Sequence, residues 1–149
     1  MSVDVLTEVT ITCPCDLVAD YAANPDNAPS WYVNIKSAEW KSPPPLRIGS
    51  KVAFVAYFLG KRMAYTYEVT EYVPHQRLVM RTAEGPFPME TTYTWESSAQ
   101  NVTRMTLRNR GNPSGFSRLL APFMAMAMRR ANRSDLARLK ALLEKQQAA

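Results

Sequence analysis

Residues 50–110 form a succession of short alternating segments separated by turn residues, and this pattern limits the fold more than any other feature of the chain. Polar and apolar residues alternate there with the period of a strand that has one buried face. The predicted strands are 51–59, 62–72, 76–82, 88–96 and 102–110, and the turns between them contain Gly60-Lys61, Pro74-His75, Gly85-Pro86 and the polar run 97–101. Such regular spacing predicts an antiparallel meander and not alternating β–α units.

The segments on either side of the meander complete the pattern. Residues 3–12 and 34–41 are predicted to be two further strands. Between them, Pro14 opens a short helix at its first helical position, and another helical turn or two fits before Trp31. Residues 114–147 are predicted to be helical, and the 26 residues from Pro122 onward would extend for ~39 Å, enough to cross a sheet.

These elements define an expected fold class. It is an α+β fold in which an antiparallel sheet of six to seven strands curves around a long C-terminal helix, with two short helices after the first strand. The 149 residues suit a single domain spanning 1–149. A strongly twisted sheet curves, and one helix cannot fill its whole concave side. We therefore expect a cavity of ~300 Å³ or more between helix and sheet.

Charge is distributed unevenly along the chain. The net charge is +5, but residues 1–100 carry 8 Lys and Arg against 11 Asp and Glu, whereas residues 101–149 carry 10 Lys and Arg against only Asp135 and Glu144. A basic half of this kind fits an ordinary solvated surface or contact with an anionic partner. Aromatic residues do not interleave with the basic ones as they do in a single-strand binding groove, so no nucleic-acid partner is expected.

Several other protein classes are disfavoured. No stretch approaches the ~20 apolar residues of a membrane span, so stable membrane insertion is not expected. The alternating, acidic N-terminal segment does not resemble a secretory signal peptide, and we expect a cytoplasmic protein. Cys13 and Cys15 are too close for an easy disulfide, and with His75 they lack the further ligands of a closed zinc site. Neither a metal nor a cofactor is predicted.

The order of elements and several local motifs resemble the START/polyketide-cyclase-like (SRPBCC) superfamily. The family's first two helices resemble Cys13-Pro14 with Val18 and Asn24-Pro25 through Trp31. Its approach to the third strand resembles Arg47-Ile48-Gly49-Ser50. Its fourth strand resembles residues 67–72 with Pro74, and its helix end resembles Asp135 through Glu144. The resemblance covers nearly the whole chain and implies a helix-grip fold with a cavity between sheet and helix. Function does not follow from it, because the family includes lipid carriers, hormone receptors, aromatic cyclases and chaperone cofactors.

Strand alternation predicts which residues line such a cavity. The side of each strand that carries charges must be solvated, because an unpaired buried charge is too unfavourable. The opposite side is rich in Met and Tyr, which suits a hydrophobic small molecule such as a lipid, a polyketide or an aromatic compound. With residues from the helices, the predicted ligand-binding set is Trp31, Phe54, Tyr65, Tyr67, Met80, Met89, Thr91, Tyr93, Leu107, Phe116, Leu120, Phe123 and Met124. Four buried hydroxyls in this set would each need a partner in a filled core, which favours a pocket.

Signals for catalysis are weak. No nucleophile elbow, metal-ligand spacing or phosphate-binding glycine loop is present. Alternation sends Glu68 and Glu90 outward, whereas Glu71 shares the inner side of its strand and is the one candidate general acid or base. The primary interpretation is therefore a non-catalytic binding protein. A polyketide cyclase or dehydratase and a protein-interaction module with a filled core are the alternatives.

The run FMAMAM at 123–128 makes the C-terminal helix apolar on all sides. One side must face the sheet, and the other then needs a cover, because such a helix is normally buried. The first expectation is an intramolecular cover by the short helices around Tyr21 and Trp31. A homodimer comes second, and docking to an anionic membrane, helped by Arg129, Arg130 and Arg133, comes third.

Overall fold

The computed structural model describes residues 3–85, 88–112 and 121–148, and it confirms the α+β helix-grip fold. The described elements in chain order are β1 (Val3–Ile11), α1 (Cys15–Ala23), the 3₁₀ turn η1 (Pro25–Asn27), α2 (Ala28–Trp31), β2 (Ile35–Trp40), β3 (Lys51–Phe58), β4 (Lys61–Val73), β5 (Arg77–Glu84), β6 (Met89–Ala99), β7 (Val102–Gly111) and α3 (Ala121–Ala148). The predicted helical residues 114–120 lie outside the described ranges.

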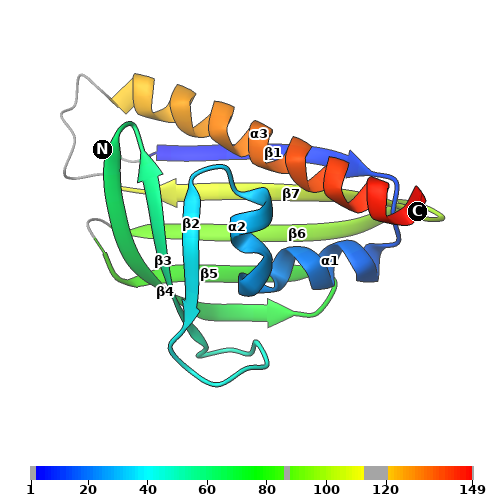
Figure 1. Ribbon diagram of the computed structural model, residues 1–149, viewed down its shortest axis with the longest axis horizontal. Coiled ribbons are helices and arrows are strands. Elements are labelled where there is room, and N and C mark those ends of the chain that lie inside the picture. The colour runs from blue at the N-terminus through cyan, green and yellow to red at the C-terminus, as the bar shows by residue number, and fades with distance from the viewer. Residues whose placement is uncertain (1–2, 86–87, 113–120, 149) are drawn as a thin grey trace.

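The sheet contains seven antiparallel strands in the order β1-β7-β6-β5-β4-β3-β2. Consecutive strands pair with each other from β2 to β7, and β1 closes the order by pairing with β7. The sheet curls so that β2 and β3 lie across the direction of β6 and β7, and α1, α2 and α3 lie on the same side of it (Figure 1). The enclosed side of the sheet is therefore the side on which a core or a cavity can form.

The inner side of the sheet follows the predicted alternation. On β7, Thr103, Met105 and Leu107 are buried, while Arg104 and Arg108 are exposed. The last turns of α3 complete the core with Leu136, Leu139 and Leu143, which are almost inaccessible to solvent. Each of these leucines contributes roughly 1.5–3 kcal/mol through burial.

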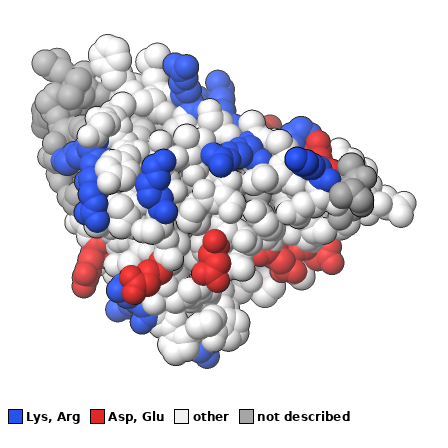
Figure 2. Space-filling model, viewed as in Figure 1, with Lys and Arg blue, Asp and Glu red and all other residues white. Residues whose placement is uncertain are grey.

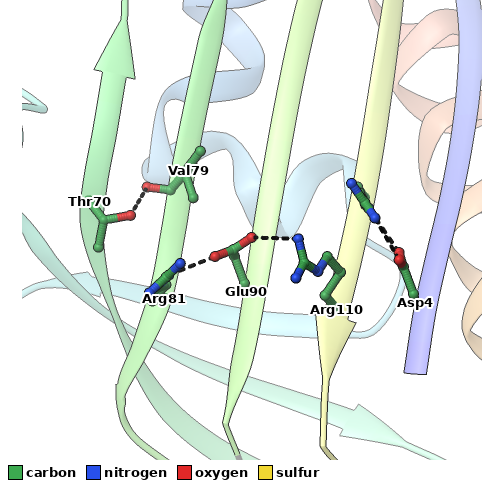
Figure 3. A network of polar contacts seen from close by, with 7 residues as sticks. Asp4, Thr70, Val79, Arg81, Glu90 and Arg110 are labelled. Carbon is green, nitrogen blue, oxygen red and sulfur yellow. Dashed lines mark hydrogen bonds and ion pairs between the residues drawn. The ribbon is translucent and has the colours of Figure 1, made fainter. Parts of the chain in front are cut away.

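The outer side of the sheet carries charges that alternate in sign from strand to strand. Register places Lys51, Glu68, Arg81, Glu90, Arg110 and Asp4 opposite one another on β3, β4, β5, β6, β7 and β1. Glu90 accepts from Arg81 Nε at 2.6 Å and lies 3.9 Å from Arg110 Nη1 (Figure 3). Asp4 accepts from Arg108 at 2.6 Å. Opposite charges across strands favour this register, and the solvated row keeps the outer side from being a second apolar face.

None of the described helices is long and apolar enough to cross a membrane.

Candidate functional site

A cavity of about 130 Å³ lies between the inner side of the sheet and α3. Residues of β3, β4, β5, β6, β7 and α3 line it, together with Tyr32, Asn34 and Ile35 from the α2–β2 region. The volume is smaller than the ~300 Å³ or more predicted from the sequence, so the predicted size was wrong. Three aromatic rings of the lining are in mutual contact, with centroids 5.0–5.9 Å apart: Phe54 stacks on Tyr65, and Tyr67 meets both of these rings edge to face.

One end of the cavity is apolar and adaptable. Phe58 and Met63, from the β3–β4 hairpin, pack there against Met124 and Met128 of α3, and Met89 of β6 joins the same cluster. Methionine has an unbranched side chain with three rotatable bonds and adapts to differently shaped neighbours. This end can therefore change shape to accommodate an apolar group.

The opposite end is polar and belongs mainly to α3 and the α2–β2 region. The hydroxyls of Tyr32 and Tyr93 hydrogen-bond to each other, and Asn132 and Asp135 reach the same space from α3. Burial raises the pKa of Tyr32 and of Tyr93 well above its ordinary value. At neutral pH these phenols are uncharged and can donate a hydrogen bond.

A second chain of hydrogen bonds crosses the strands beneath the cavity. The Tyr67 hydroxyl lies 2.9 Å from Thr91 Oγ1, and Thr91 Oγ1 donates to Asn109 Oδ1 at 2.7 Å. Because Thr91 donates its only proton to Asn109, the Tyr67 hydroxyl must donate to Thr91. Desolvation raises the pKa of Tyr67 to about 12.

Asp135 is the acidic residue of the cavity lining, and only 2% of it is exposed. The backbone N–H of Val33 donates to its Oδ1 at 2.9 Å. Desolvation raises the pKa of Asp135 to about 6, while the Val33 hydrogen bond and the Arg138 charge partly oppose the increase. The carboxyl group can therefore accept or release a proton close to neutral pH.

Asn132, one turn of α3 before Asp135, has a buried amide nitrogen with no hydrogen-bond partner among the described residues. The buried indole nitrogens of Trp31 and Trp95 also lack a hydrogen-bond partner among the described residues, but neither tryptophan lines the cavity. A buried donor without a partner costs about 1–3 kcal/mol. The Asn132 amide is thus a donor that a bound molecule could satisfy.

Eight of the predicted ligand-binding residues line this cavity. They are Phe54, Tyr65, Tyr67, Met80, Met89, Thr91, Tyr93 and Met124. Trp31 and Leu107 are fully buried in the core but do not reach the cavity; Tyr32, whose ring lies 4.1 Å from that of Trp31, occupies the lining position. Phe116 and Leu120 lie outside the described residues.

Phe123 was expected in the lining, and the structure corrects this expectation, because the residue is 67% exposed. The buried side of α3 follows Met124, Met128, Asn132 and Asp135. Phe123 is rotated from Met124 by ~100° around the helix, which turns it toward solvent.

Glu71 is likewise not a cavity residue. The β4–β5 register shifts between Val69 and Glu71, so the alternation of β4 changes at Thr70. After this β-bulge it is Tyr72 that packs against the core, while the Glu71 side chain is about half exposed and pairs with Arg77 at 3.0 Å. A bulge adds one residue to a strand and reverses the side on which later residues lie, which simple alternation cannot anticipate.

The predicted set omitted six polar lining residues, namely Tyr32, Asn34, Thr82, Asn109, Asn132 and Asp135. A signal for two of them existed. Extending the Leu136–Leu139–Leu143 stripe toward the N-terminus at helical spacing reaches Asn132 and Met128, with Asp135 beside them. Polar residues on an otherwise apolar stripe indicate a site, because a buried polar group needs a partner.

Comparison with known proteins agrees with the fold. A family model described as polyketide cyclase / dehydrase and lipid transport matches residues 2–144. The chain therefore belongs to this family, within the START/SRPBCC superfamily. None of the curated protein sequences matches the chain.

Several solved structures are similar over nearly their whole length. The Zhui aromatase/cyclase from Streptomyces sp. R1128 has a TM-score of 0.83 at 16% identity, covering 98% of this chain and 96% of that chain. A START superfamily protein from Mycobacterium smegmatis has a TM-score of 0.83 at 11% identity, covering 96% and 98%. The protein TTHA0849 from Thermus thermophilus has a TM-score of 0.80 at 21% identity, covering 93% and 94%. At these identities the similarity shows the fold alone.

Proposed function

We propose that the protein binds a small hydrophobic molecule with one polar end in the cavity between the sheet and α3. The observation that carries the proposal is the division of the cavity into a methionine-rich end and a polar end, where the Asn132 amide lacks a partner among the described residues. A hydroxyl or carbonyl oxygen of the ligand would accept from Asn132 Nδ2, and its apolar part would lie among the methionines.

The size of the cavity limits the ligand. A volume of about 130 Å³ is close to that of an engineered cavity of ~150 Å³ that binds benzene. A cavity of this size therefore suits a group of about one ring, such as a phenol. A longer ligand, such as an acyl chain, requires the methionine side chains at the apolar end to move.

Calorimetric titration with 4-ethylphenol tests the site with a ligand of this size. Ala131 of α3 lines the cavity, and Ala131→Phe should fill it and weaken binding roughly tenfold or more. Ala137→Phe, on the exposed side of the same helix, is the matched control and should leave the affinity unchanged. Thermal unfolding of both variants identifies any loss that comes from misfolding. Equal affinities in two folded variants would show that the phenol binds elsewhere.

A polyketide cyclase or dehydratase activity is the second candidate, and Asp135 is the observation that favours it. A carboxylate with a pKa of about 6 can remove a proton from a carbon next to a ligand carbonyl. The carbonyl oxygen would then carry the negative charge of the enolate, stabilised by hydrogen bonds from Asn132 Nδ2 or a neutral tyrosine hydroxyl. The family description and the Zhui aromatase/cyclase fold are consistent with this chemistry.

Deuterium exchange into the methyl group of 4-hydroxyacetophenone, followed by NMR, distinguishes the two candidates. A catalytic Asp135 predicts exchange that rises with pH through about 6 and falls by 10²–10⁴ in Asp135→Asn. Glu71→Gln removes a carboxylate outside the cavity and is the matched control. The binding function predicts exchange rates within about tenfold of one another in all three proteins.

A protein-interaction module would be expected to have a filled core, whereas the described residues line a cavity of about 130 Å³.

A further inference from the structure

The N-terminal half of α3 presents an apolar surface that nothing in the described structure covers. Phe123 is 67% exposed and Met126 is 66% exposed. The intramolecular cover expected from the sequence is therefore wrong for these two residues. The short helices meet α3 further along, where the N–H of Val33, just after α2, donates to Asp135.

The β3–β4 hairpin adds a second apolar projection beside the first. Its residues Phe58 and Met63 pack against Met124 and Met128, so the hairpin tip lies next to the beginning of α3 (Figure 1). Leu59, at the tip, is 58% exposed. Leu59, Phe123 and Met126 thus come from two elements that are in contact with each other.

The conformation of Leu59 is unfavourable for a leucine. Leu59 and Gly60 have φ angles of 52° and 76°, the pattern of a type I′ turn, in which Asn-Gly is strongly preferred. A leucine side chain in the left-handed region is strained, and its exposure leaves little packing to compensate. A residue that breaks the local rule without a stabilising contact points to a role outside folding.

Positive charge lies next to these apolar residues. At ~100° per residue, Phe123, Met126, Arg130 and Arg133 fall within about 80° on one side of α3. Arg130 and Arg133 are exposed, and neither forms an ion pair with another described residue. Lys61 and Arg62 follow Leu59 in the hairpin and are also exposed. Most of the Lys and Arg in this view lie over α3 and the upper part of the molecule, whereas most of the Asp and Glu lie along the lower part (Figure 2).

We propose that Leu59, Phe123, Met126, Arg130 and Arg133 form a surface that docks onto an anionic lipid membrane. The apolar side chains would enter the boundary between headgroups and acyl chains, while the arginines contact lipid phosphates. A second copy of the chain fits this surface less well, because each copy would bring the same positive charges to the interface, and the five residues of the surface include no acidic residue to pair with them. Docking does not require an occupied cavity, so it stands independently of the proposed ligand.

Vesicle flotation tests the proposal, with vesicles of phosphatidylcholine alone or mixed with phosphatidylglycerol. The protein should float with the mixed vesicles, and binding should decline as salt increases. Arg130→Glu with Arg133→Glu should weaken binding roughly tenfold or more. Lys145→Glu reverses an exposed charge in the last turn of the same helix and should have little effect.

Leu59→Asn tests the apolar part without endangering the fold. Asparagine tolerates the left-handed conformation, so thermal stability should stay the same or rise while binding to mixed vesicles falls several-fold. Ile48→Ser removes a residue of similar exposure, 65%, in the loop between β2 and β3, and is the matched control. Equal losses in Ile48→Ser and Leu59→Asn would overturn the assigned surface.

Sedimentation velocity across a concentration series distinguishes the remaining outcomes. The proposal predicts a monomer that binds anionic vesicles. A dimer that dissociates on Met126→Glu would show that a second copy covers the surface, and a monomer that binds neither vesicle type would refute docking.

Discussion

Both sides of the sheet carry polar residues, but the partners of these residues differ between the two sides. On the outer side, Glu90 pairs with Arg81, and Asp4 pairs with Arg108, within reach of solvent. On the inner side, hydroxyls and amides replace the ion pairs, and Asp135 lines the cavity without an ion-pair partner among the described residues. The outer side can be fully explained by folding. The inner side contains the buried Asn132 amide, which lacks a partner among the described residues, and the Asp135 carboxyl group, whose pKa is raised. Folding requires neither of these features.

This difference indicates that the inner side contains groups that lower stability and are retained for function. A buried carboxylate with a raised pKa and an amide without a partner each reduce the free energy of unfolding. Functional sites commonly retain such groups, since residues optimised for binding are not optimised for stability. Substitutions on the inner side should therefore have larger effects, and sometimes effects of opposite sign, than matched substitutions on the outer side.

The largest expected effect is a stabilisation by Asp135→Asn. The pKa of Asp135 is raised from 3.8 to about 6 in the folded state, so the folded protein binds the proton more tightly than the unfolded chain. Its contribution to stability therefore falls as pH rises from about 4 to 6, by up to ~3 kcal/mol. Asparagine can still accept from the Val33 N–H. Urea unfolding should show the variant about 2–3 kcal/mol more stable than wild type at pH 8, with the difference shrinking toward pH 4.

Asp4→Asn is the matched substitution on the outer side. The hydrogen bond from Arg108 lowers the pKa of Asp4, so its contribution is present at neutral pH and is lost as pH falls through the folded-state pKa. This variant should be slightly less stable than wild type at pH 8. A destabilising Asp135→Asn at that pH would contradict the proposed difference between the two sides.

The next largest effect concerns two threonines of β6 that lie on opposite sides of the sheet. Thr91→Val leaves the Tyr67 hydroxyl and Asn109 Oδ1 without their shared partner, and should cost about 1–3 kcal/mol. Thr94 hydrogen-bonds to Thr106 on the outer side, where water can replace the bond. Thr94→Val should change the free energy of unfolding by no more than about 0.5 kcal/mol, and chemical denaturation of both variants would reveal whether the two effects differ.

The smallest effect is expected for the outer row of charges. Glu90→Gln removes the carboxylate between Arg81 and Arg110, and should cost about 0.5–1 kcal/mol at low ionic strength. Salt screens exposed ion pairs, so the loss in the free energy of unfolding should nearly vanish at ~1 M salt. A loss that persists at high salt would show that Glu90 stabilises the sheet by packing.

The sequence was sufficient for the elements and their order, because alternation on β6 and β7 and the turns between strands are local signals. It also placed Tyr65, Tyr67, Thr91 and Tyr93 on the inner side, where the structure has them. The expectations for Glu71 and Phe123 failed for physical reasons. A bulge reverses the side of Glu71, and the rotational position of α3 is determined by packing along its whole length.

The polar end of the cavity could not be assembled from the sequence, since its members are far apart in the chain. Tyr32 meets Tyr93, and Val33 meets Asp135, only after the sheet has curled and α3 has packed against it. The raised pKa of Asp135 likewise depends on desolvation in the folded state.

The most direct test of the account compares the binding of 4-ethylphenol and ethylbenzene to wild type and to Asn132→Leu. The two compounds differ by one hydroxyl group, and a hydrogen bond from Asn132 Nδ2 is worth about 0.5–1.5 kcal/mol. Wild type should therefore bind the phenol roughly two- to twelvefold more tightly, and Asn132→Leu should bind both compounds with similar affinity. Equal affinities in wild type, or a preference for the phenol that survives Asn132→Leu, would contradict the claim that this end of the cavity is kept for a ligand.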